Sequence, residues 1–170
     1  MVIWLIGISG AGKTTLGKKL KEYLDTRGRE SYLIDGNLVR DFFDNDLGFS
    51  REDRVANIKR IMLAAHILSQ NGKITIVCNI HPFEELRRFA RRKIEDYNEI
   101  YLKKSLEDSR RDDDKGVYWS QIGKTEIVGL DIGFDEPECS DLVVHTGKES
   151  VEESFAKIVR YLKNKYPEEF

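Results

Sequence analysis

The stretch GISGAGKT at residues 7–14 follows the apolar run VIWLI at residues 2–6 and precedes a segment with helical periodicity. It matches the G-x-x-x-x-G-K-[ST] phosphate loop, which requires this position between a strand and a helix. The glycines let backbone N–H groups turn toward a phosphate, and the positive end of the following helix dipole points to the same place. A glycine-rich turn that matches by chance is the alternative, and the flanking pattern disfavours it. The stretch therefore predicts a site for a nucleoside triphosphate.

Residues of this loop have separate expected roles. Lys13 can reach the β- and γ-phosphates, and the Thr14 hydroxyl can take a ligand position on Mg²⁺. ATP and Mg²⁺ are accordingly the expected cofactors. The residues expected to bind ATP are Gly7, Ser9, Gly10, Ala11, Gly12, Lys13, Thr14 and Thr15.

Length and composition narrow the class of protein. The chain has 170 residues, 34% of them charged, with a net charge of −2, which suits one domain over residues 1–170 and disfavours a nucleic-acid partner. The arginine-rich stretch at residues 87–93 is interpreted as a solvent-exposed helix face. The apolar start is too short for a signal peptide or a membrane span, and Cys78 and Cys139 have no metal-site spacing. We therefore expect a cytoplasmic protein without a membrane partner.

Apolar runs that are typical of buried strands alternate with helical periods along the chain. Strands are expected at residues 2–6, 31–34, 74–78, 99–102 and 142–144, and main helices at 13–26, from 50 onward, at 84–93 and at 149–163. This alternation predicts an α/β fold in which helices cover both faces of a parallel sheet. The acidic, glycine-punctuated stretch at residues 112–138 breaks the pattern. We interpret it as a lid, with a disordered insert as the alternative.

Polar residues follow two of the expected strands, where ligands gather in open parallel sheets. Asp35 can order Mg²⁺ through water or accept a proton from an acceptor hydroxyl, and a plain Asp-Gly turn residue is the alternative. His81 can contact an anionic acceptor group, or it is a strand-end histidine satisfied by backbone. Pro82 follows it and predicts an extended backbone at His81. Both strand ends are therefore candidate parts of one site.

A third candidate group lies at the start of the long helix. Arg54 and Asn57 are three residues apart and share a helix face, and Phe49 precedes them. An arginine and an asparagine can hold an anionic, hydrogen-bonding substrate while the ring stacks on a base. A solvated surface is the alternative.

Several stretches share their order and approximate spacing with one enzyme family. They are LIDGNLVR at residues 33–40, DLGFS at 46–50, DRVANI at 53–58, IHPF at 80–83, KGVY at 115–118 and GLD at 129–131. Over nearly its whole length the chain resembles the adenylylsulfate (APS) kinase family.

The resemblance implies a three-layer P-loop kinase fold and transfer of the ATP γ-phosphoryl group to a ribose 3′-hydroxyl of a small nucleotide acceptor. Lys13 and Asp35 match catalytic positions, with Thr14 and Asp35 at the metal. The positions implied to bind the acceptor are Arg40, Phe49, Arg54, Asn57, Ile80, His81, Lys115 and Ile127. Related kinases are commonly dimers, so a homodimer is expected.

Four positions depart from the family pattern. Asn37 replaces an aspartate, His81 replaces a serine and Ile127 replaces the aromatic residue that closes over the acceptor adenine. The lid arginine has no direct match, although Arg110 or Arg111 could substitute. Loss of one aromatic face should cost on the order of 1–3 kcal/mol of base stacking.

These departures favour a smaller base on the acceptor. We therefore expect cytidine diphosphoramidate, the acceptor of a related kinase in capsule phosphoramidate biosynthesis, and adenylylsulfate is the alternative. A nucleotide-dependent switch or regulatory ATPase is the alternative of another class. The chain contains no N-K-x-D motif, which disfavours a GTPase switch.

Overall fold

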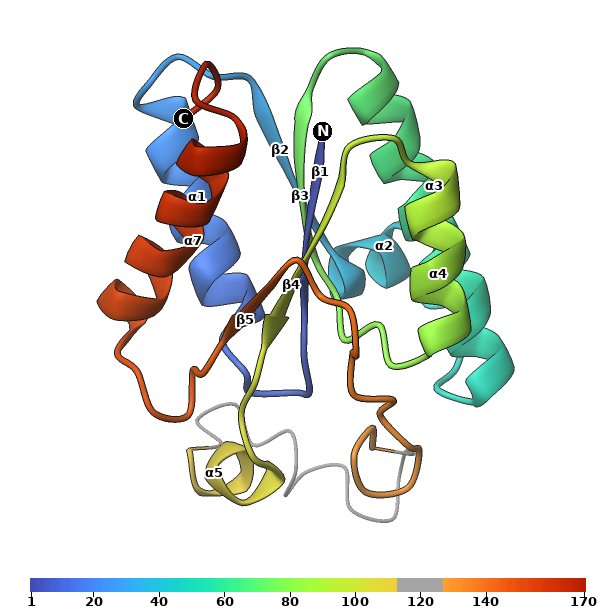
Figure 1. Ribbon diagram of the computed structural model, residues 1–170. Helices are drawn as coiled ribbons and strands as arrows, with labels where there is room; N and C mark the ends of the chain where they lie inside the picture. Colours follow the sequence, from blue (N-terminus) through green and yellow to red (C-terminus); the bar gives the residue numbers. More distant parts are fainter. Residues whose placement is uncertain (113–126) are drawn as a thin grey trace.

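The computed structural model describes residues 1–112 and 127–170, and at its centre lies a five-stranded sheet in the order β2-β3-β1-β4-β5 (Figure 1). All neighbouring strands are parallel. The strands are β1 (Val2–Ile6), β2 (Ser31–Asp35), β3 (Ile74–Cys78), β4 (Tyr97–Leu102) and β5 (Leu142–Val144). Because parallel strands all run the same way, their carboxyl ends share one edge of the sheet, which is where ligand sites form.

Helices cover both faces of this sheet. Figure 1 shows α1 (Lys13–Asp25) and α7 (Val151–Lys165) on one face, and α3 (Arg51–Gln70) and α4 (Glu84–Lys93) on the other. The short helices α2 (Gly36–Phe42) and α5 (Leu106–Arg111) lie toward the carboxyl edge of the strands. The predicted α/β fold is confirmed. None of the helices in residues 1–112 and 127–170 is both long and apolar enough to cross a membrane.

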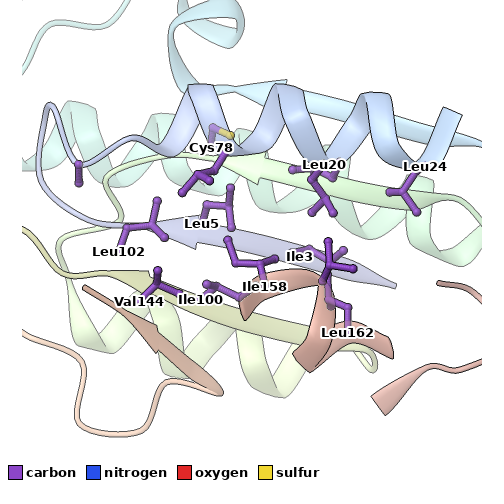
Figure 2. Close-up of a cluster of buried hydrophobic side chains, with 14 of the residues drawn as sticks. Ile3, Leu5, Leu20, Leu24, Cys78, Ile100, Leu102, Val144, Ile158 and Leu162 are labelled. Atoms are coloured by element: carbon purple, nitrogen blue, oxygen red, sulfur yellow. The ribbon is translucent and has the colours of Figure 1, made fainter. Parts of the chain in front are cut away.

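Every side chain of β1 is buried, and successive side chains enter two separate apolar cores. Ile3 and Leu5 pack with Leu20 of α1 and with Ile158 and Leu162 of α7 (Figure 2). The intervening residues of β1 pack against α3 and α4. Burial of a large aliphatic side chain contributes about 1.5–3 kcal/mol, so the two cores hold β1 firmly in place.

Side-chain capping accounts for two short helices that the sequence analysis did not predict. The Asp35 carboxylate accepts a hydrogen bond from the Asn37 amide and begins α2, and Ser105 begins α5 in the same way; neither short helix was predicted. Strand β4 begins at Tyr97, two residues earlier than expected. The lid prediction is only partly covered, because residues 113–126 lie outside the described chain.

Two expectations about side-chain exposure are wrong. Arg87, expected on a solvent-exposed face, is only 1% exposed. His81 is fully buried, its backbone has φ +52° instead of an extended value, and its ring centre lies 4.6 Å from that of Trp4. Both imidazole nitrogens are buried without a hydrogen-bond partner among the described residues. Burial and the nearby Arg87 charge lower the pKa of His81 to about 3.

This lowered pKa predicts a loss of stability at acid pH. The folded protein keeps His81 neutral, whereas the unfolded chain takes up a proton below pH 6.5, so stability is complete above pH 6.5 and falls toward pH 3. We expect His81 to contribute up to about 1.4 kcal/mol per pH unit to this fall. Urea denaturation of the wild type and of His81→Phe at pH 7.5, 6.0 and 5.0 measures this contribution as the difference between the two free energies of unfolding at each pH. Equal pH dependence of the two proteins would contradict the prediction, because all other groups cancel in the difference.

Candidate active site

A cavity of about 380 Å³ opens at the carboxyl edge of the sheet. Its walls come from the phosphate loop with the start of α1, from the end of β2 with α2 and the start of α3, and from residues that follow β3 and precede β5. Most of the predicted site residues line it: Ser9, Gly10, Gly12, Lys13, Thr14, Thr15, Asp35, Arg40, Phe49, Arg54, Asn57, Ile80 and Ile127. The fold therefore brings together residues that are far apart in the sequence.

The phosphate loop takes its shape from a tight turn directly after β1. Gly7 has φ +147°, and a Cβ at this position would lie 2.6 Å from the Leu102 carbonyl oxygen, so only glycine fits. The Lys13 ammonium donates hydrogen bonds to the carbonyl oxygens of Gly7 (2.8 Å) and Ile8 (2.6 Å). Gly7 and Ala11 are themselves buried and do not line this cavity, so at its surface they act by shaping the loop.

Thr14 and Asp35 meet across the cavity floor. The Thr14 hydroxyl donates a 2.8 Å hydrogen bond to Oδ2 of Asp35, and Oδ1 accepts from the Asn37 amide. The described part of the chain holds no group of three or more His, Cys, Asp or Glu side chains that could bind a metal. Mg²⁺ commonly takes only one or two protein oxygens together with waters and substrate phosphates. A hydroxyl and a carboxylate in contact beside a phosphate loop fit that requirement.

Arg40, Phe49 and Arg54 form a second wall of the cavity. The Arg40 Nη1 donates to two carbonyl oxygens of the loop before Phe49, those of Leu47 (2.9 Å) and Gly48 (2.7 Å). The guanidinium carbons of Arg40 and Arg54 lie 4.6 and 5.4 Å from the centre of the Phe49 ring. Burial lowers the pKa of Arg40, yet an arginine remains protonated at neutral pH. This wall combines positive charge with an aromatic face, which suits an anionic nucleotide.

Asn57 adds a buried amide to the same wall. Its Nδ2 is 3.4 Å from the Gly36 carbonyl oxygen, whereas its Oδ1 is buried and has no partner among the described residues. An unsatisfied buried oxygen costs free energy that a ligand N–H or O–H group could recover. Asn57 is therefore placed to accept a hydrogen bond from a molecule in the cavity.

The third wall is apolar and contains Ile80, Pro82 and Ile127. Ile127 is held in a tight turn because its amide donates a 2.8 Å hydrogen bond to Oδ2 of Asp131. His81 does not line the cavity, and its imidazole packs on Trp4 instead, which contradicts the prediction that it contacts the acceptor. Lys115, predicted to bind the acceptor, lies outside the described residues.

Sequence reasoning missed a second cavity of about 130 Å³ on the other side of the phosphate loop. Gly10, Ala11, Gly12 and Thr15 form one side of it, and Lys104, Thr146, Glu149 and Ser154 contribute to the other. The hydroxyl oxygens of Thr146 and Ser154 are buried without a partner in the described structure. The available signal was the position of Thr146 just after β5, because ligands gather at strand ends.

Cys78 also lines the main cavity, although its sequence context predicted only a buried strand position. Its thiol donates to the Lys13 carbonyl oxygen at 3.2 Å, and burial raises the pKa of the thiol to about 12. A thiol that stays protonated at neutral pH is a poor nucleophile, so Cys78 acts in packing.

Comparison with known proteins identifies the family of the chain. A family description, "Adenylylsulphate kinase", matches residues 1–145. The adenylyl-sulfate kinase of Picosynechococcus sp. is 37% identical over 164 residues, which cover 95% of this chain and 93% of the relative. A solved structure of the Mycobacterium tuberculosis APS kinase CysC in complex with AMPPNP and APS has a TM-score of 0.88 at 30% identity, covering 95% of this chain and 96% of that one.

A more distant structure shows only the shared fold. A gluconokinase from Sinorhizobium meliloti has a TM-score of 0.62 at 16% identity, with 97% of this chain and 95% of that chain covered. The resemblance to a P-loop kinase fold and to the adenylylsulfate kinase family is thus confirmed. With a family match over residues 1–145 and a relative 37% identical over nearly its full length, this chain belongs to the adenylylsulfate kinase family of ATP-dependent phosphotransferases, which act on a hydroxyl group of a nucleotide.

Proposed function

We propose that this protein transfers the γ-phosphoryl group of ATP to the ribose 3′-hydroxyl of adenylylsulfate. The observation that carries the proposal is the main cavity, in which the phosphate loop, the Thr14–Asp35 pair and the arginine-rich wall around Phe49 face one space. The named relatives are adenylyl-sulfate kinases, and the similar Mycobacterium tuberculosis structure holds APS together with an ATP analogue.

The two cavities suggest where each nucleotide lies. Both use Gly10, Gly12 and Thr15 of the phosphate loop, so the loop separates them. We place the ATP phosphates at the loop and the ATP nucleoside in the smaller cavity, where the unpartnered Thr146 and Ser154 hydroxyls can bind it. The acceptor then occupies the larger cavity, with its anionic part toward Arg40 and Arg54.

The residues at the loop supply the chemistry of phosphoryl transfer. The Lys13 ammonium would leave its two carbonyl partners to bind the β- and γ-phosphates and stabilise the charge that develops on them. Thr14 and Asp35 would hold Mg²⁺, which when bound neutralises phosphate charge. The Asp35 carboxylate would also accept the proton of the acceptor hydroxyl and orient that oxygen toward the γ-phosphate.

The relatives favour adenylylsulfate over cytidine diphosphoramidate as the acceptor. The expectation of a cytidine acceptor depended partly on His81, whose ring lies outside the cavity, and no comparison supports a role in capsule biosynthesis. Ile127 does line the cavity, and an aliphatic side chain there can pack on an adenine ring. The homodimer, the cytoplasmic location and the lid remain predictions.

Our main prediction concerns the acceptor. We expect steady-state ADP release from MgATP with adenylylsulfate, at a kcat/KM at least about tenfold above that with cytidine diphosphoramidate, a difference of about 1.4 kcal/mol. Lys13→Ala should abolish turnover with either acceptor because it removes charge stabilisation at the transferred group.

Parallel controls separate the alternatives. Turnover with the cytidine compound alone would reassign the acceptor, and rapid ATP hydrolysis without any acceptor would favour a switch or regulatory ATPase. Ile127→Phe adds an aromatic face and should lower the KM for adenylylsulfate, with Ile127→Leu as the matched aliphatic control.

A second prediction tests the Thr14–Asp35 pair. Asp35→Asn keeps the size of the side chain but removes its charge and its capacity to accept a proton, so kcat should fall by about 100-fold or more while the KM for ATP changes little. The Mg²⁺ concentration for half-maximal activity should also rise. Asp41→Asn is the matched control, because Asp41 is an exposed carboxylate on the same short helix and lies outside the cavity. An unchanged kcat in Asp35→Asn would contradict a catalytic role, and Asp35 would then serve only as the N-cap of α2.

A further inference from the structure

Arg87 is the most deeply buried charged side chain among the described residues, with 1% of its surface exposed. It lies in the first turn of α4, next to the third wall of the main cavity but not in the cavity lining. Its Nε and Nη2 donate to Oε2 of Glu84 at 3.0 and 2.6 Å, so a carboxylate balances its charge. A buried guanidinium is costly unless its donors are satisfied, and this one has acceptors for all three nitrogens.

The remaining donors of Arg87 join two separate backbone segments. Nη1 donates to the carbonyl oxygen of His81 at 2.8 Å, and Nη2 donates to that of Asp135 at 2.7 Å. The same two segments are also joined directly, because the Asp135 amide donates to the Pro82 carbonyl oxygen at 2.9 Å. A planar, two-armed donor can hold two carbonyl oxygens in a fixed relation, which a single ammonium group cannot do.

Both joined segments lead into the wall of the main cavity. His81 lies between Ile80 and Pro82, which line the cavity. Asp135 follows the tight turn that carries Ile127 and Val128 into the same wall, and that turn closes through the bridge between Val128 and Ile132. The position of the two segments therefore sets where the apolar wall of the cavity lies.

We propose that Arg87 is a positioning residue for the acceptor nucleotide: it holds the backbone at His81 and at Asp135 so that Ile80 and Ile127 form one rigid apolar wall. The inference rests on the proposed function, because it assigns the larger cavity to the acceptor. Among the described residues, the hydrogen bonds of Arg87 go to Glu84, His81 and Asp135 and not to the phosphate loop. The loop meets the same segment through a long hydrogen bond from the Gly7 amide to the Ile80 carbonyl oxygen (3.4 Å), so we expect ATP binding to depend on Arg87 less than acceptor binding does.

The strained backbone at His81 explains why the hydrogen bond from Arg87 is needed. A bulky residue at φ +52° is held there only when its surroundings compensate for the strain. Packing of the imidazole on Trp4 fixes the ring, and the Arg87 hydrogen bond fixes the carbonyl group. Without the guanidinium, the chain between Ile80 and Pro82 can relax and displace the wall.

The test is equilibrium binding, measured by titration calorimetry with adenylylsulfate, cytidine diphosphoramidate and the ATP analogue AMPPNP. Arg87→Met is measured alone, since Glu84 stays paired with Arg88, and together with Glu84→Gln, which removes the charge of the half-buried partner carboxylate as well. We expect the Kd of the acceptor to rise at least about tenfold and that of AMPPNP to change less than about threefold. Arg87→Lys keeps the charge beside Glu84 but cannot reach both carbonyl groups, so it should also weaken acceptor binding.

Arg91→Met is the matched control. Arg91 lies one turn further along α4 and likewise bridges to another segment, through the Asp141 carboxylate (3.0 Å) and the Cys139 carbonyl oxygen (3.1 Å), but that segment does not border the cavity. The Arg91→Met variant should therefore bind the acceptor and AMPPNP with the same Kd values as the wild type.

The outcomes separate the two proposals. Equal acceptor affinity in wild type and in the Arg87 variants, or full rescue by Arg87→Lys, would overturn the positioning role, as would a parallel loss of AMPPNP affinity. Failure of the wild type to bind adenylylsulfate would instead overturn the proposed acceptor. If the wild type then binds the cytidine compound, the Kd values of wild type and variants for that compound test the positioning role. A wild type that binds neither acceptor would overturn both.

Discussion

The turn out of β1 is the constraint on which the site depends. β1 is buried on both faces, so its carboxyl end cannot shift, and at Gly7 the chain passes so close to the Leu102 carbonyl group that no Cβ fits. The chain must therefore turn back over the edge of the sheet and start α1 within a few residues. This places Lys13 and Thr14 over the strand ends, where Asp35 arrives from β2. Two buried cores thus supply the rigidity that a phosphate-binding loop needs.

Local patterns in the sequence were sufficient for most of this architecture. The five strands and the main helices follow from apolar periodicity, because each element buries a continuous face. The short helices α2 and α5 were missed because a capping side chain decides them. Asp35 before glycine is equally typical of a turn, and only the hydrogen bond to the Asn37 amide shows that a helix begins there. Most residues of the phosphate loop, together with Arg40, Phe49, Arg54 and Asn57, line one cavity, and each of them belongs to a local motif that the sequence displays.

The misplaced residues are those whose environment is set by distant parts of the chain. Arg87 lies in a run of arginines that is typical of a solvated helix face, yet its partners include the backbone at Asp135, 48 residues away. Its spacing from Phe83 and Ala90 places it on the buried face of α4, whereas Arg88 is exposed, but an arginine on such a face does not reveal its distant partners. The position of His81 is likewise set by residues that are distant in the sequence. Its proline neighbour favoured an extended backbone, but packing against Trp4 and the tie to Arg87 hold it in the left-handed region.

The lining of the main cavity bears on how the proposed acceptor would be recognised. Phe49 contacts the guanidinium groups of Arg40 and Arg54, whereas another part of the cavity lining is aliphatic at Ile80 and Ile127. Stacking on one aromatic face holds any base, since every base has a π-face, so stacking alone discriminates weakly. Discrimination then requires a hydrogen bond that only the correct nucleotide can make, because an unpaired buried polar group costs more than a lost contact. Under the proposed function, Asn57 would supply such a hydrogen bond, since its Oδ1 is buried and has no partner among the described residues.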